Sequence, residues 1–118
     1  MRFAFRRPQF PAIVVAGDRV FGAISPAALK RLLQRERRPG IHIKLLDPTW
    51  EWFELSDESD LITPSFLERA TPTKRAILAL VNGRSNRAPG APLYEPRSLS
   101  NHSREAIFAE LLALLSRR

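Results

Sequence analysis

The segment FPAIVVAGDRVFGAI, residues 10–24, constrains the fold more than any other part of the sequence. β-Branched and aromatic residues stand on both sides of the turn dipeptide Gly17-Asp18, and this pattern is typical of a β-hairpin. A two-residue turn joins antiparallel strands, so we expect antiparallel pairing to be the default in the sheet.

Residues 41–55 predict a second hairpin. Apolar residues alternate along 41–45, and Asp47-Pro48-Thr49 provides the turn. Successive side chains of a strand point to opposite sides, so the residues after the turn divide between two faces. One face receives Trp50, Trp52 and Glu54, and the other receives Glu51, Phe53 and Leu55.

Ser25-Pro26 marks the clearest helix start. The Ser25 side chain can accept a hydrogen bond from a free backbone N–H, and proline is tolerated at the first helical position because its missing N–H would be unpaired there. The helix is predicted over residues 26–38, and Pro39-Gly40 ends it. At about 100° per residue, leucines cover one side and polar residues fill an arc of about 140° on the other. The polar arc consists of Lys30, Arg31, Gln34, Arg35 and Arg38.

Further helices are predicted in the C-terminal half. Thr63-Pro64 and Thr71-Pro72 repeat the capping pattern, which predicts a short helix near 64–69 and a longer one over 72–82. A last helix over 101–116 carries a wide apolar stripe that must be covered. The stripe consists of Ile107, Phe108, Leu111, Leu112, Leu114 and Leu115.

These elements predict an α+β fold. Two β-hairpins form a mostly antiparallel four-stranded sheet, with one helix between them and two to three C-terminal helices. Residues 1–83 form the core domain in this interpretation, and residues 84–100, which include three prolines, form a linker or an ordered surface loop, a tether being the simpler alternative. Residues 101–118 form an amphipathic helix that docks on the core or on a partner.

The charge of the chain favours an acidic partner. The 118 residues carry a formal net charge of +7. Residues 1–40 hold nine cations and two anions, 41–70 two and seven, and 71–118 eight and three, so the acidic block could pair internally with its basic neighbours. The chain has no cysteine, which excludes disulfides, thiolate metal sites and a cysteine nucleophile.

The pattern favours a small, basic, non-catalytic binding module over an enzyme. We expect it to contact nucleic acid, or another acidic surface such as an acidic protein, through the basic face of helix 26–38. The alternative is that this face is simply solvated. The predicted contact residues are Lys30, Arg31, Arg35, Arg37, Arg38, Arg6 and Arg7.

Two other functions remain open. A small, metal-independent, toxin-like ribonuclease could use the arginines to stabilise charge while His42 or Tyr94 moves a proton. A protein–protein adaptor, or a homodimer, could use the C-terminal helix instead. The interaction residues would then be Ile107, Phe108, Leu111, Leu112 and Leu115.

We expect no metal, no cofactor and no membrane partner. Asp57, Glu58 and Asp60 lack the order of ligands and glycine that a calcium loop needs. No apolar run approaches the roughly 20 residues that span a bilayer. Pro8 and Pro11 interrupt the only segment that resembles a signal peptide, so a cytoplasmic location is expected.

Overall fold

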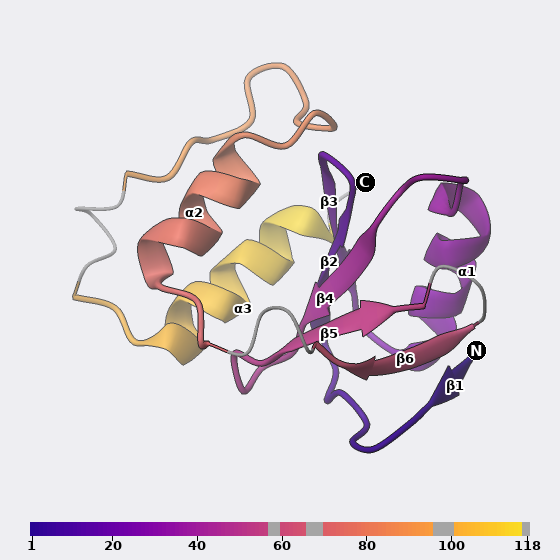
Figure 1. Cartoon of the computed structure of the whole chain (residues 1–118). Coiled ribbons are helices and arrows are strands. Elements are labelled where there is room, and N and C mark those ends of the chain that lie inside the picture. The colour runs from indigo at the N-terminus through magenta and orange to yellow at the C-terminus, as the bar shows by residue number, and fades with distance from the viewer. Residues whose placement is uncertain (57–59, 66–69, 96–100, 117–118) are drawn as a thin grey trace.

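A computed structural model describes residues 1–56, 60–65, 70–95 and 101–116. The fold is α+β, as predicted, with a six-stranded mixed sheet and three helices in the described residues (Figure 1). The strands are β1 (Arg2–Phe3), β2 (Ala12–Ala16), β3 (Arg19–Ala23), β4 (Ile43–Leu46), β5 (Trp52–Leu55) and β6 (Leu61–Pro64). The helices are α1 (Pro26–Glu36), α2 (Lys74–Asn82) and α3 (Arg104–Leu115).

The two predicted hairpins form the centre and one edge of the sheet. The strand order is β1-β6-β5-β4-β2-β3. β2 pairs with β3 around the Gly17-Asp18 turn, with Ala16 opposite Arg19, and β4 pairs with β5. β2 and β4 also pair antiparallel, which joins the two hairpins into one sheet.

The prediction of four strands was wrong because it missed β1 and β6. β6 pairs antiparallel with β5, and β1 pairs with β6 in the parallel direction. Thr63-Pro64, taken as a helix start, lies at the end of β6, where proline also favours an extended conformation for the residue before it. The rest of the predicted helix, 66–69, lies outside the described residues.

The other helices differ from prediction at their ends. The Ser25 side chain accepts from the Ala28 N–H, as predicted, but α1 ends at Glu36 because Arg37 is already extended. α2 is capped by Thr73 and begins at Lys74, two residues after the predicted start. α3 is capped by Ser103.

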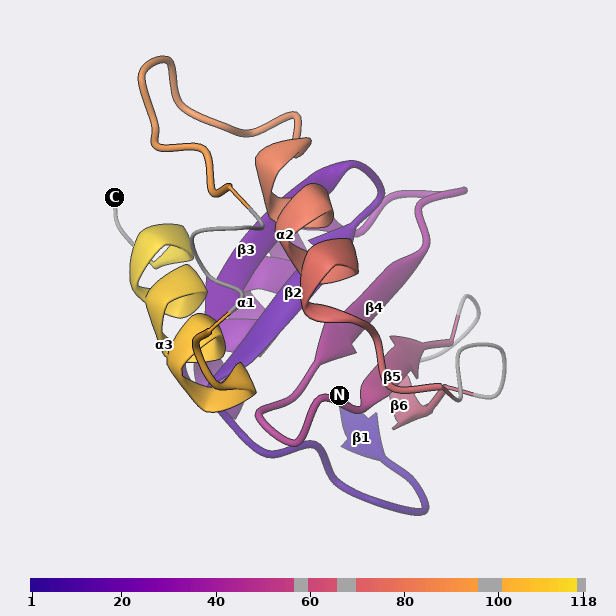
Figure 2. The ribbon, with the colours of Figure 1, turned by 90° about the vertical axis from the view of Figure 1, so that its left-hand side faces the viewer.

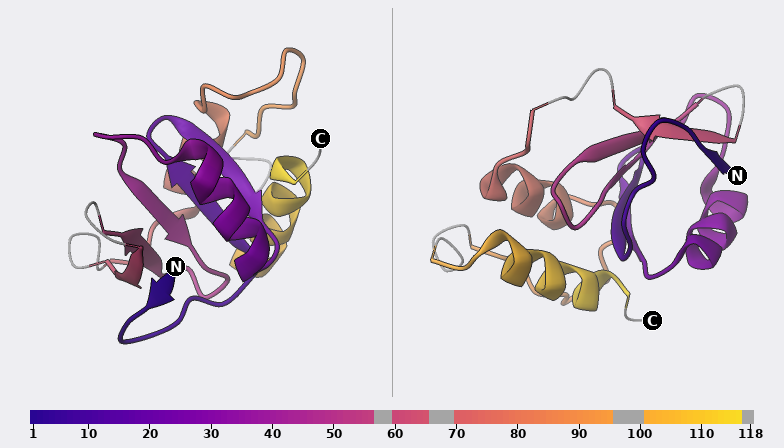
Figure 3. Two further views of the ribbon diagram at one scale, coloured as in Figure 1. Left: turned by 90° about the vertical axis from the view of Figure 1, so that its right-hand side faces the viewer. Right: turned by 90° about the horizontal axis from the view of Figure 1, so that it is seen from below.

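The helices cover opposite faces of the sheet. Figure 2 shows α2 and α3 in front of β2, β3 and β4, and the left view of Figure 3 shows α1 on the other side. Leu29, Leu32 and Leu33 of α1 pack against one face. That face contributes Val14, Leu45, Phe53, Leu55 and Ile62, among others.

The second core lies between the other face and the two C-terminal helices. Trp50 and Trp52 pack here with β2, α2 and α3, so the predicted division of the second hairpin between two faces is confirmed. Gly22 of β3 faces the end of α3, where a Cβ atom would lie 2.7 Å from Ser116 Oγ. Glycine therefore allows α3 to approach the sheet at this point.

Residues 84–95 form a loop that is bonded to the rest of the fold. Asn82 and Tyr94 exchange two hydrogen bonds, and the Ser85 N–H donates to the Asp18 carbonyl. Arg84 is buried, and this burial lowers its pKa; the charge of Arg87 lowers it further, whereas Tyr94 acts in the opposite direction. Hydrogen bonds thus join residues 84–95 to α2 and to the turn between β2 and β3.

Within the described ranges, no helix has both the length and the apolar character that crossing a membrane requires.

Candidate functional site

Two cations of α1 and one just beyond its end have no ion-pair partner among the described residues. Lys30, Arg31 and Arg38 are exposed, and no described carboxylate lies within salt-bridge distance of them. α1 points Lys30 and Arg31 outward because its leucines occupy the opposite arc against the sheet. The prediction that Arg38 shares this helical face was wrong, because α1 ends at Glu36 and Arg38 follows the extended residue Arg37.

Other predicted cations are already paired. Arg37 forms an ion pair with Asp60 and donates to the Ser56 carbonyl at 3.2 Å. Arg6 pairs with Glu51, the residue before β5. The acidic block therefore does pair with the basic block before it, and this pairing leaves fewer free cations than the net charge suggests.

Arg6 and Arg7 come from the loop after β1 and not from α1. The Arg7 guanidinium lies 4.9 Å from the centre of the Phe3 ring, in a cation–π contact. Arg6 pairs with Glu51. The two arginines are therefore engaged with residues other than the α1 cations.

Glu36 organises one side of α1, and the sequence analysis missed it. This carboxylate is buried and pairs with Arg19 at 2.9 Å and with Arg35 at 3.3 Å. Both guanidinium groups also lie over the Phe21 ring. Helical spacing could have revealed Glu36, because a residue four after Leu32 falls on the apolar arc and needs a partner there.

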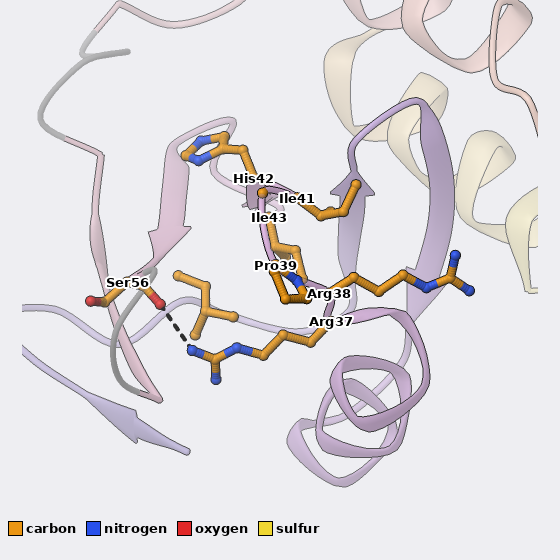
Figure 4. Close-up of a pocket in the computed structure, with 9 residues that line it drawn as sticks. Arg37, Arg38, Pro39, Ile41, His42, Ile43 and Ser56 are labelled. Atoms are coloured by element: carbon orange, nitrogen blue, oxygen red, sulfur yellow. Dashed lines mark hydrogen bonds between the residues drawn. The ribbon is translucent and has the colours of Figure 1, made fainter.

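A hollow of about 500 Å³ lies beyond the end of α1 (Figure 4). Arg37, Arg38 and His42 line it together with Ser56. In Figure 4 the Arg37 side chain reaches toward Ser56, while the His42 ring turns away from the two arginines. Tyr94 lies elsewhere, beside Asn82 of α2, so the two residues predicted to move protons do not line one hollow.

A groove of about 520 Å³ lies on the other side of α1, between α1, β3 and the end of α3. Arg31 and Arg35 line its α1 side, and Leu115 and Ser116 line its α3 side. Arg31 is thus the predicted contact residue that belongs to both the outward face and this groove.

The predicted interaction residues of the C-terminal helix lie in the core. Ile107, Phe108, Leu111 and Leu112 are buried against the sheet and α2. Leu115 is half-buried and lines the groove beside β3. An adaptor or homodimer that used the buried four would require α3 to leave the sheet.

The described residues contain no group of three or more histidines, aspartates or glutamates that could hold a metal ion. Of the acidic loop, Asp60 pairs with Arg37, while Asp57 and Glu58 lie outside the described residues.

Comparisons with family models, with curated proteins and with solved structures find no match to this chain.

Proposed function

We propose that this protein is a non-catalytic module that binds an acidic macromolecule, in the first place nucleic acid, through the outward face of α1 and Arg38, which lies two residues beyond the end of α1. The observation that carries the proposal is the free charge of Lys30, Arg31 and Arg38, which no described carboxylate neutralises. Contact between such cations and phosphates favours binding, because it releases counterions that are condensed on the nucleic acid.

The expected contact is with phosphates and not with base edges. α1 packs along the sheet and presents long, flexible cations, which bind a charged backbone without reading sequence. Binding should therefore depend weakly on sequence and steeply on salt.

Titration of labelled DNA and RNA tests the proposal. Three phosphate contacts predict a slope of about −2.7 for log K against log salt on duplex DNA, so a fourfold rise in salt should weaken binding about 40-fold. The double variant Lys30→Glu with Arg38→Glu should weaken binding at low salt by at least about 10-fold, since it replaces attraction with repulsion.

Arg75→Glu is the matched control. Arg75 is an exposed cation of α2 with no ion pair in the described part of the chain. It should change affinity only slightly if the α1 face is the site. Absence of binding at low salt, or an equal effect of Arg75→Glu and the α1 variant, would overturn the proposal.

A metal-independent ribonuclease is the second candidate. One observation favours it: His42 lines the same hollow as Arg37 and Arg38, although its ring turns away from both arginines. The same RNA samples test it, because this candidate requires cleavage by the purified protein and loss of cleavage in His42→Ala. Intact RNA, or an equal cleavage rate in the variant, would remove it.

A further inference from the structure

The outer edge of β3 is already partly occupied by a side chain. β3 is the last strand of the sheet, and its only strand neighbour among the described residues is β2. The Asn86 side chain accepts from the Val20 N–H at 3.0 Å and donates to the Val20 carbonyl at 2.9 Å. One amide of the 84–95 loop thus takes the place of a neighbouring strand at Val20.

The next outward position on β3 is open. Val20 lies opposite Val15 and Gly22 lies opposite Ile13. Hydrogen-bonded and non-hydrogen-bonded pairs alternate along two antiparallel strands, so Gly22, two residues after Val20, belongs to the same kind of pair as Val20. Gly22 therefore also turns its N–H and carbonyl away from β2. Neither group has a hydrogen-bond partner among the residues that the structure describes.

These open groups lie in the groove between α1 and α3, whose two walls differ in chemistry. The α1 wall carries Arg31 and Arg35. Glu36 is shared between Arg19 and Arg35, so this wall keeps a net positive charge. The α3 wall presents Leu115 and Ser116 and carries no charge at these positions.

An apolar hollow continues from the end of the groove. Ile24 and Ser116 line both spaces, so the two adjoin where β3 ends. The hollow has a volume of about 500 Å³, and Pro11, Pro48 and Phe108 line it together with one charged residue, Glu105. Ile24 is 67% exposed, so its side chain is accessible to a bound segment at the junction of the two spaces.

We infer that this groove binds an extended peptide segment of a partner protein, which adds to β3 as a strand and whose side chains alternate between acidic and apolar. Side chains of an extended chain point to opposite sides in turn. Acidic residues would then face Arg31 and Arg35, and apolar residues would face Leu115 and the hollow beside Ile24. The backbone would hydrogen-bond with Gly22, as in other cases of strand addition.

Charge argues against a second copy of this chain as the occupant. Pairing β3 with the β3 of another copy would bring the Arg19, Arg31 and Arg35 side chains of both chains together. Like charges that approach without counterions are repelled, whereas an acidic segment is attracted.

Binding of a labelled peptide of alternating glutamate and valine, (Glu-Val)5, tests the inference. Arg31→Glu should weaken its binding by at least about 10-fold, because repulsion replaces a charge-assisted contact. Ile24→Ser should weaken it by about fivefold through lost apolar contact. Hydrogen exchange of the Gly22 amide should slow when the peptide is bound.

Matched controls separate strand addition from simple charge attraction. The same peptide with alternate backbone amides methylated keeps its side chains but cannot pair with Gly22, so it should bind at least about 10-fold more weakly. Leu93→Ser removes another exposed apolar side chain, outside the groove, and should have no effect. Lys30→Glu with Arg38→Glu, which should weaken nucleic-acid binding, should change peptide affinity only slightly because neither residue lines the groove.

Several results would overturn the inference while leaving the proposed function intact. These are no binding of (Glu-Val)5, equal binding of the methylated peptide, or an equal loss in the Lys30 and Arg38 double variant and in Arg31→Glu. A dimer of the protein alone that Ile24→Ser dissociates would also overturn it, because the occupant would then be a second copy.

Discussion

The two helical layers differ in how far along the chain their contacts reach. α1 follows β3 and precedes β4, so it packs against strands that are near it in sequence. α2 and α3 follow the last strand and pack on the opposite face against β2 and β3. Asn86, in the loop between them, bonds to Val20, 66 positions earlier. Local sequence thus specifies the start of α1 and its apolar arc, although Ile62 of β6 also belongs to the core that α1 covers. The second layer depends on contacts between more distant segments.

The layers also differ in what they present outward. α1 exposes cations that have no partner within the described segments, and the groove beside it includes an open strand edge. The α2 and α3 layer contributes the apolar wall of that groove through Leu115. The proposed peptide site therefore needs both layers, whereas the proposed nucleic-acid face needs only α1.

The largest effect should come from removing a leucine from either core. Leu29 of α1 and Leu111 of α3 are both fully buried, so each Leu→Ala change should lower the free energy of unfolding by about 3 kcal/mol. Urea unfolding of the two variants measures the difference. A loss of less than about 1 kcal/mol for Leu111→Ala alone would show that α3 is not an integral part of the core.

A smaller loss of stability is expected when the hydrogen bonds between Asn86 and β3 are removed. Asn86→Ala removes both hydrogen bonds to Val20 and should cost about 2 kcal/mol, since each such bond contributes about 1 kcal/mol. Hydrogen exchange of the Val20 amide should become faster. Unchanged stability and exchange would mean that the loop does not fix the second layer.

The smallest stability effect should come from the ion pairs of the α1 layer. Glu36→Ala removes the partner of Arg19 and Arg35, but both guanidinium groups reach solvent and can be hydrated. The expected loss is about 1 kcal/mol, measured by the same unfolding experiment. A loss as large as that of Leu29→Ala would show that this ion-pair cluster stabilises the α1 layer as strongly as its leucines do.

In the candidate site too, local sequence predicts which side chains are exposed but not which of them form ion pairs. Periodicity placed Lys30 and Arg31 outward and the leucines inward, and both placements agree with the structure. Arg38 is also exposed, but it lies beyond the end of α1, so helical periodicity does not explain its position. The same periodicity did not predict two ion pairs between distant residues. Arg37 pairs with Asp60, 23 positions later, and Arg6 pairs with Glu51, 45 positions later. Which cations remain free is a property of the folded chain and not of its composition.

The sequence by itself determined the two hairpins, the start of α1 at Ser25 and the division of apolar residues between two faces. Each of these depends on neighbours within a few positions, through turn geometry, capping and the helix and strand periods. Only the tertiary structure decided the parallel pairing of β1 with β6, the ion pair between Glu36 and Arg19, and the hydrogen bonds between Asn86 and the Val20 backbone. Those contacts join segments far apart in the chain, and they form only where burial in the shared core offsets the entropy lost in closing the long loops between them.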